Sequence, residues 1–283
     1  MRYATVRRAG TTAAAVLQGE ELLLLDAPDV GAALRAGIGS VARTGEAVPV
    51  ADAQLAPVIT APRKVICLGL NYRSHILEVT GGAPLPPYPT LFPKWADTLT
   101  GPYDDIPVPD PALADAVDWE AELAVVVGRP LHRADAQQAQ AAIGGYTVAN
   151  DISMRGWQLR TDQWMPGKAW DATTPLGPYL VTGDDIDHAA ALEITCEVNG
   201  VRRQTGNTSD LLFGPAAALS YISTFTRLHP GDVVLTGTTG GVGIASGATT
   251  LLVAGDVVRT EIEGIGVLEN RIVAEAGDRG PRA

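Results

Sequence analysis

Two glutamates at the start of a short apolar stretch indicate a site for a positive charge. Glu120 and Glu122 lead into the run 123–127, which is rich in β-branched residues and closed by Gly128, as expected for a buried strand. Side chains alternate along a strand, so the two glutamates would point the same way, about 7 Å apart at the backbone. Asp118 would share that face if the strand begins early enough. Carboxylates aimed together repel each other and are costly to desolvate unless a cation lies between them.

A third carboxylate comes from a separate stretch. Asp151 follows the expected strand 146–149, so it also lies at a strand end. Three carboxylates with room for water suit Mg²⁺, Mn²⁺ or Ca²⁺, and no His-x-x-x-His motif or cysteine pair competes for zinc. The spacing alone leaves one alternative open, in which Glu120 and Glu122 lie in water at a frayed strand end.

An imidazole and a carboxylate follow another expected strand. After the apolar residues 65–70 the chain enters a helix-like segment in which His75 and Glu78 are three residues apart, so they share a face and can touch. A carboxylate beside an imidazole raises its pKa and orients it, which is the pairing that a general base needs. A solvated pair on a surface helix is the alternative.

The glycine-rich segment 237–243 has no phosphate-loop signature. It lacks both the Lys-Ser/Thr ending and the G-x-G-x-x-G spacing. Its backbone amides, with the Thr236 and Thr238 hydroxyls, would let a small ligand approach closely, or the glycines simply turn the chain.

Composition restricts the class of protein. The 283 residues could form one large domain or one and a half ordinary ones, and they are 46% hydrophobic and 19% charged, as in globular proteins. A net charge of −11 and a pI near 4.8 argue against a nucleic-acid partner. Cys67 and Cys196 lie far apart in apolar runs, which predicts buried thiols rather than a disulfide. Since we find neither a signal peptide nor about 20 consecutive apolar residues, we predict a cytoplasmic protein without membrane contact.

The order of elements predicts a β-rich α+β fold. Residues 1–60 resemble a small N-terminal domain with strands at 3–7, 14–18 and 22–25 and a helix at 29–36, and residues 61–283 would form the catalytic domain. In the larger part we expect helices at 134–143 and 211–225, no regular structure at 81–93, and strands at 179–182, 193–199, 201–204, 233–235, 249–253 and 257–262. A doubly wound parallel sheet would need more full-length helices.

Taken together, the motifs resemble the fumarylacetoacetate hydrolase family, in one order over roughly residues 60–275. The matching motifs are Leu70-Asn71-Tyr72-x-x-His75-x-x-Glu78, Phe92-x-Lys94, Asp118-Trp119-Glu120-x-Glu122, Asn150-Asp151-x-x-x-Arg155, Lys168-x-x-Asp171, Val198-Asn199-Gly200 and Pro230-Gly231-Asp232-Val233-x-x-Thr236-Gly237-Thr238. The resemblance implies the family's mixed β-roll, preceded by a small N-terminal domain, and a homodimer.

The resemblance also implies roles for single residues. Glu120, Glu122 and Asp151 would hold one Mg²⁺ or Mn²⁺ ion, with Ca²⁺ as a third choice. His75 with Glu78 would activate a water, on a flap that closes over the substrate. Lys168 would stabilise developing charge, and the substrate contacts would come from Gln158, Thr238 and Arg155. For Arg155 and Lys94 a structural ion-pair role is the alternative. Departures from the family pattern at Gly156, Thr239 and Ile244 leave the substrate open.

The implied activity is metal-dependent hydrolysis of a C–C bond in a 2,4-dioxo acid, of the acylpyruvate or fumarylpyruvate kind, to a 2-oxo acid and a carboxylic acid. Decarboxylation of an oxaloacetate-type acid, or keto–enol or double-bond isomerisation of the hydroxyheptadienedioate type, uses the same chemistry and is not separated from hydrolysis by these motifs. A catalytically silent ligand-binding homologue is the third reading. In each enzymatic reading the partner is a small 2-oxo or 2,4-dioxo acid.

Overall fold

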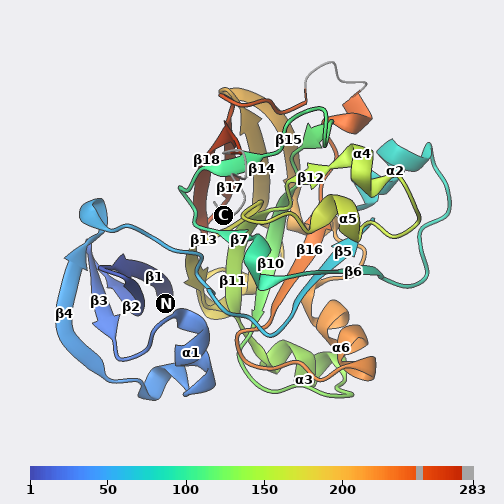
Figure 1. Ribbon diagram of the computed structural model, residues 1–283. Coiled ribbons are helices and arrows are strands. Elements are labelled where there is room, and N and C mark those ends of the chain that lie inside the picture. Colours follow the sequence, from blue (N-terminus) through green and yellow to red (C-terminus); the bar gives the residue numbers. More distant parts are fainter. Residues whose placement is uncertain (247–250, 276–283) are drawn as a thin grey trace, which may run out of the picture.

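The computed structural model describes residues 1–246 and 251–275, and these form three β-sheets with few helices (Figure 1). The largest, of eleven strands, has the order β4 (Arg43–Pro49), β3 (Glu21–Leu25), β2 (Thr11–Gln18), β1 (Arg2–Arg8), β13 (Thr174–Val181), β11 (Ile143–Asn150), β10 (Ala121–Val127), β16 (Val233–Thr238), β5 (Val65–Gly69) and β6 (Thr90–Lys94), while β7 (Leu99–Thr100) pairs with β13. Most pairs are antiparallel, and β16 with β5 is a parallel pair. This β-rich α+β architecture is the predicted fold class.

Two smaller sheets complete the structure. One has the order β15 (Val201–Asn207), β14 (Glu193–Val198), β17 (Val257–Ile262), β18 (Gly266–Ala274) and β8 (Ile106–Val108), and the other pairs β12 (Ser153–Met154) with β9 (Val117–Asp118). The helices are α1 (Val30–Arg35), α2 (Arg73–Thr80), α3 (Ala136–Ala141), α4 (Arg155–Gln158), α5 (Met165–Lys168) and α6 (Pro215–Phe225). Among the described residues, no helix has the length and apolar character needed to cross a membrane.

The N-terminal strands continue the large sheet. Strands β1 to β4 form a curled antiparallel arrangement beside the rest of the molecule (Figure 1), and β1 joins the sheet by pairing Arg2 with Val181 and Tyr3 with Leu180. Asp29 caps α1 by accepting a hydrogen bond from Ala32 N (2.6 Å). The helix predicted at 29–36 therefore starts directly after an aspartate, a residue that is preferred at this capping position. The division of the chain near residue 60 stays a prediction.

Several element boundaries differ from the sequence prediction. The helix expected at 211–225 begins only at Pro215, because the Asn71 side chain bonds both the N–H and the carbonyl of Phe213 and holds the preceding segment extended. Residues 81–93 were expected to be irregular, but β6 begins at Thr90 and pairs with β5 at the sheet edge, where Pro93 is tolerated. Strands β4 and β18 were not predicted. The strand expected at 249–253 lies partly outside the described residues, and Leu252 forms only an isolated bridge with Val117.

The central strand β10 is buried over its whole length and lies between β11 and β16. Its register pairs Ala121 with Asn150, which brings Glu120 next to the end of β11. The buried Asn150 side chain fixes this junction: its Oδ1 accepts from Glu120 N (2.9 Å) and its Nδ2 donates to Thr260 Oγ1 (2.9 Å) in β17. One amide therefore links the large sheet to the five-stranded sheet.

We expect Asn150→Ala to lower the free energy of unfolding by about 2 kcal/mol or more, because it leaves the buried Glu120 N–H and the Thr260 hydroxyl without their partner. Urea denaturation in EDTA measures this. Gln18→Ala removes an exposed amide from the same sheet and is the matched control, with an expected change within about 0.5 kcal/mol. An Asn150→Ala variant as stable as the control would contradict the proposed link.

Candidate active site

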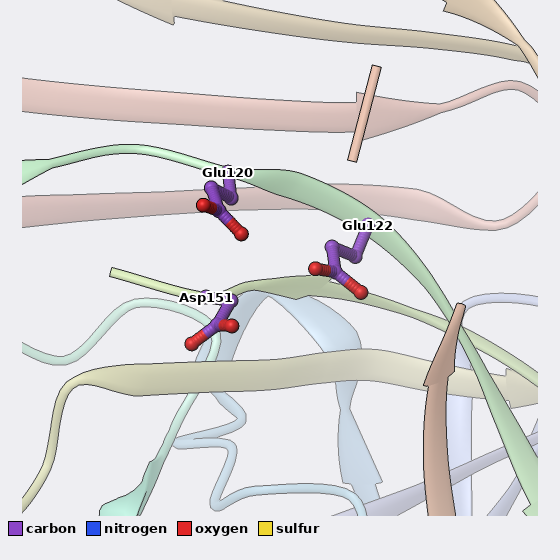
Figure 2. A group of neighbouring side chains, drawn as sticks. All are labelled: Glu120, Glu122 and Asp151. Atoms are coloured by element: carbon purple, nitrogen blue, oxygen red, sulfur yellow. The ribbon is translucent and has the colours of Figure 1, made fainter. Parts of the chain in front are cut away.

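Three buried carboxylates converge where β10 and β11 meet. Glu120 precedes β10, Glu122 is its second residue and Asp151 follows β11, and one oxygen from each lies within 4.8 Å of the others (Figure 2). Asp151 N donates to Glu120 O (2.9 Å), which ties the two segments together. The two glutamates point to the same side as expected, although Glu120 lies in the break between β9 and β10 rather than in one continuous strand. At 6% and 1% exposure, Glu120 and Glu122 are not at a frayed strand end in water.

Three cations surround the carboxylates. Lys168 Nζ lies 2.7 Å from Glu120 Oε2 and 3.0 Å from Asp151 Oδ2, and Lys94 Nζ lies 2.5 Å from Asp151 Oδ1. Arg155 Nη1 donates to Glu120 Oε1 (2.6 Å). Burial alone would raise the pKa of Glu120, but the charges of Lys168 and Arg155 outweigh it and lower that pKa to about 2. Glu120 is therefore ionised at neutral pH.

Glu122 is the carboxylate that these cations do not satisfy. Its Oε2 accepts from Gly237 N (2.7 Å), while Oε1 is buried without a hydrogen-bond partner among the described residues. Burial, together with the charges of Asp151 and Glu120, raises the pKa of Glu122 well above its ordinary value. A bound dication would offset the repulsion between the carboxylates and would give Glu122 Oε1 the partner that it lacks.

The charge balance agrees with a cation site. Asp118 joins the cluster through Arg155, whose Nη2 lies 2.8 Å from its Oδ2, so four carboxylates face three cations when all are ionised. The net charge of −1 would become +1 with a dication, which suits an anionic ligand. The donor set, made only of carboxylate oxygens, fits a hard divalent ion such as Mg²⁺ or Mn²⁺, and the triad could bind one.

Lys168 is a fixed positive charge rather than a base. Its side chain is 2% exposed, and its ammonium also lies 5.4 Å from the centre of the Phe92 ring. Burial would lower the pKa of Lys168, but the adjacent Asp151 and Glu120 carboxylates more than compensate and raise it above its ordinary value. The group thus remains an ammonium that can donate to a ligand oxygen.

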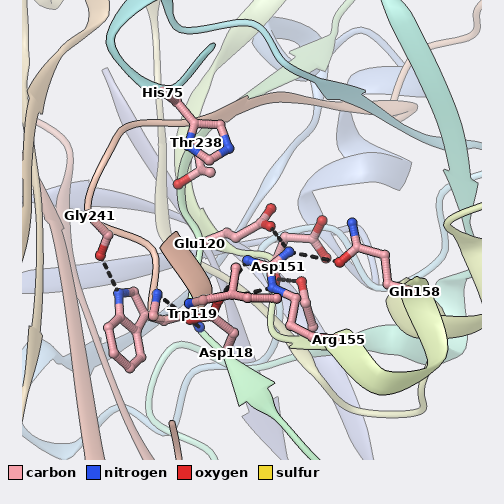
Figure 3. Close-up of polar contacts among 12 residues, drawn as sticks. His75, Asp118, Trp119, Glu120, Asp151, Arg155, Gln158, Thr238 and Gly241 are labelled. Atoms are coloured by element: carbon pink, nitrogen blue, oxygen red, sulfur yellow. Dashed lines mark hydrogen bonds and ion pairs between the residues drawn. The ribbon is translucent and has the colours of Figure 1, made fainter. Parts of the chain in front are cut away.

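Arg155 has a structural environment. Its guanidinium bonds Asp118, Glu120 and the Oε1 of Gln158 (2.8 Å), as Figure 3 shows. Asp118 in turn accepts from the backbone N–H groups of Gly243 (2.7 Å) and Ile244 (3.0 Å). This chain of bonds fixes the loop after β16 relative to the triad. The contacts of Arg155 are thus those of a structural ion pair, which was the alternative to a substrate contact. Lys94 is also held in an ion pair, with Asp151. Among the described residues, only the carbonyl oxygen of the Gln158 side chain has a partner, so its amide nitrogen could donate to a ligand.

His75 and Glu78 lie together on α2, as their spacing predicts. His75 Nδ1 is 3.3 Å from Glu78 Oε2, and His75 is only 9% exposed. Gly241 N donates to both Glu78 oxygens, at 3.0 and 3.2 Å, and Trp119 Nε1 donates to Gly241 O (3.1 Å). The pair is therefore attached to the wall of the site, with His75 buried and the Glu78 side chain partly exposed (28%).

Part of this cluster lines one cavity of about 240 Å³, whereas Glu78, Glu122 and Asp151 are not among its lining residues. It is lined by most of the expected site residues, which are His75, Glu120, Arg155, Gln158, Lys168 and Thr238. The Thr238 hydroxyl donates to Ala121 O and accepts from Gln204, so it belongs to the floor but is already engaged. In Figure 3, His75 and Thr238 lie on one side of Glu120, and Arg155 lies on its other side.

The sequence prediction missed two residues of the site. Trp164 lines the cavity, packing edge to face on Phe92 (5.9 Å between ring centres) and lying over Gly69, where an added Cβ would come within 2.1 Å of its ring. Gln204 is buried and accepts from Ala121 N (2.9 Å). A tryptophan in an aromatic loop and a glutamine in a hairpin strand carry no spacing signal that would identify either role.

Comparison with known proteins agrees with this geometry. Residues 64–273 match the family model described as fumarylacetoacetate (FAA) hydrolase, C-terminal, and residues 1–57 match Rv2993c-like, N-terminal. The human protein named oxaloacetate tautomerase FAHD2A, mitochondrial, is 43% identical over 221 residues, which is 77% of this chain and 69% of the relative.

Two solved structures are similar over nearly the full length. That of 5-carboxymethyl-2-hydroxymuconate delta-isomerase from Mycobacterium smegmatis has a TM-score of 0.81 at 35% identity, covering 97% of this chain and 100% of the other. That of a fumarylacetoacetate hydrolase from Exiguobacterium antarcticum has a TM-score of 0.83 at 29% identity, with the same coverage. Since the family model and the human relative each span most of the chain, this protein belongs to the fumarylacetoacetate hydrolase family.

Proposed function

We propose that the protein is a divalent-metal-dependent enzyme that interconverts the enol and keto forms of a 2-oxo acid. The observation that carries the proposal is one cavity lined by Glu120 of the buried carboxylate triad, by the Lys168 ammonium and by the His75 imidazole, which pairs with Glu78. The relatives support tautomerisation more than the hydrolysis that we expected first, because the human relative is named as a tautomerase and a similar structure as an isomerase.

Glu120, Glu122 and Asp151 would hold the Mg²⁺ or Mn²⁺ ion, and a bound dication supplies Lewis-acid polarisation of the 2-oxo group, which lowers the energy of an enolate. Lys168 would donate to the substrate oxygen on which negative charge develops, since its ammonium is buried and remains protonated. Gln158 would add a second donor, because Arg155 fixes its carbonyl and leaves its amide nitrogen free.

The proton transfer is assigned to His75. When Nδ1–H donates to Glu78, Nε2 is left as the acceptor, and Glu78 is itself held by Gly241 N. In the enol-to-keto direction the enol oxygen loses one proton and C3 gains one, so the composition of the substrate is unchanged. One orientable imidazole can serve this exchange.

C–C bond hydrolysis of a 2,4-dioxo acid is the second candidate. The same His75–Glu78 pair would remove a proton from a water that attacks the distal carbonyl, and a solved structure named as a fumarylacetoacetate hydrolase has the same fold. Decarboxylation of an oxaloacetate-type acid remains an alternative outcome. The small-acid partner, the homodimer and the cytoplasmic location stay predictions, and the human relative is named as mitochondrial.

A product-resolved assay separates the candidates. With Mg²⁺ or Mn²⁺ we expect enol oxaloacetate to lose its ultraviolet absorbance faster than in buffer, without release of CO₂, and EDTA to abolish the acceleration. Acylpyruvates are assayed in parallel for pyruvate and the free acid. Stoichiometric pyruvate plus acid, with no enol–keto acceleration, would contradict tautomerisation in favour of hydrolysis, and CO₂ release would favour decarboxylation.

We expect His75→Ala to lower kcat for tautomerisation by about 100-fold or more while Mn²⁺ affinity stays unchanged, because His75 carries the proton but is not a metal ligand. Stopped-flow absorbance gives the rate and electron paramagnetic resonance gives free Mn²⁺. His229→Ala is the matched control, since His229 lies in the turn before β16 and does not line the cavity. Full activity in the His75→Ala variant would remove this residue from the mechanism.

A further inference from the structure

We infer that the cavity binds 2-oxo acids with an apolar tail more tightly than 2-oxo acids that end in a second carboxylate. Oxaloacetate, the substrate of the assay above, would then be converted but bound more weakly than an apolar 2-oxo acid. The inference rests on the proposed function, because it assumes that the 2-oxo acid group lies at the carboxylate triad. It concerns the rest of the substrate, which must extend from the triad toward the mouth of the cavity.

The cations of the cavity are already paired. Lys168 and Arg155 are the lysine and arginine among its lining residues. Lys168 contacts Glu120 and Asp151, and the guanidinium of Arg155 is shared by Asp118, Glu120 and Gln158. Among the described lining residues, a carboxylate at the far end of a substrate would therefore find no unpaired lysine or arginine, and burying an unpaired charge is costly.

The mouth of the cavity is apolar. The lining residues with the largest exposure are Leu159 (65%), Val79 (44%) and Ile244 (40%). They come from three separate segments, namely the end of α4, α2 and the loop after β16. Exposed apolar side chains that converge on one opening mark a binding surface for an apolar group.

The inner walls of the cavity are also largely apolar. Leu68, Phe92 and Val242 line the cavity and are buried, and the Trp164 ring closes one side over Gly69. A tail that runs from the triad to the mouth thus lies against hydrocarbon and aromatic surface along its path. Transfer of such a tail from water is favourable, whereas a carboxylate would lose its hydration.

The loop that carries Ile244 is held in place independently of its side chain. Ile244 N donates to Asp118 Oδ2 (3.0 Å), and three residues before it the chain is held by the hydrogen bond from Gly241 N to Glu78. A change of side chain at position 244 therefore leaves the backbone contacts of the loop intact. This makes position 244 suitable for testing the inference.

Calorimetry with the Mg²⁺-loaded protein tests the preference by binding rather than by activity. The ligands are 5-methyl-2-oxohexanoate and 2-oxoglutarate. They share the 2-oxo acid group and the two methylene groups that follow it, but end in an isopropyl group or in a carboxylate of similar shape. We expect the apolar acid to bind about tenfold more tightly or better. Equal or tighter binding of 2-oxoglutarate would overturn the inference.

Oxalate binding shows whether a negative result contradicts only the preference for an apolar tail or also the proposed function. It mimics the 2-oxo acid group without a tail, so Mg²⁺-dependent oxalate binding supports that part of the account. If oxalate does not bind, the proposed function and the inference both fail. If oxalate binds but 2-oxoglutarate is preferred over the apolar acid, only the inference fails.

Ile244→Arg supplies the missing cation at the mouth. We expect this variant to bind 2-oxoglutarate about tenfold more tightly than the wild type and the apolar acid more weakly. Val253→Arg adds the same charge at an exposed residue (61%) that does not line the cavity, and it should leave both affinities unchanged. Identical affinities in Ile244→Arg and Val253→Arg would show that the tail does not pass position 244.

Discussion

Burial of four carboxylates in one cluster is the constraint on which the rest of the site depends. Isolated charges of this kind are too costly to bury, so each must have a partner of opposite sign. Lys94, Lys168 and Arg155 supply three of these partners. When all four carboxylates are ionised, one negative charge remains, and Glu122 has one oxygen without a partner among the described residues. A dication would account for this remainder and leave the site attractive to an organic anion.

The fold holds these charges with ordinary backbone and amide contacts. Asn150 attaches the Glu120 backbone to the five-stranded sheet, and Gly237 N holds one oxygen of Glu122. Arg155 connects Glu120 to Asp118 and so to the loop that also contacts Glu78. The groups assigned to cation binding and to proton transfer are thereby parts of one connected network, in which His75 and Glu120 line the same small cavity.

The grouping of the three carboxylates and of His75 with Glu78 was predictable from the sequence, whereas the walls of the site were not. Acidic residues at strand ends and the His75–Glu78 spacing are local signals. The structure brings the three carboxylates together and places Glu120 and His75 in one cavity. The β-rich class followed from many short apolar runs divided by turns. The edge strand β6 was missed because Pro93 and the preceding glycines and prolines suggest irregular structure. Trp164 and Gln204 reach the site only through tertiary packing between distant segments, for which a single sequence gives no spacing signal.

The central claim is that Glu120, Glu122 and Asp151 hold one divalent cation, and anomalous diffraction from crystals soaked in Mn²⁺ tests it most directly. We expect a single strong peak at about 2.0–2.3 Å from an oxygen of each of the three residues, and its loss in a Glu122→Gln variant that keeps the same fold. A well-ordered structure at saturating Mn²⁺ with no peak between these carboxylates, and with the Lys168 contacts to Glu120 and Asp151 unchanged, would contradict the account.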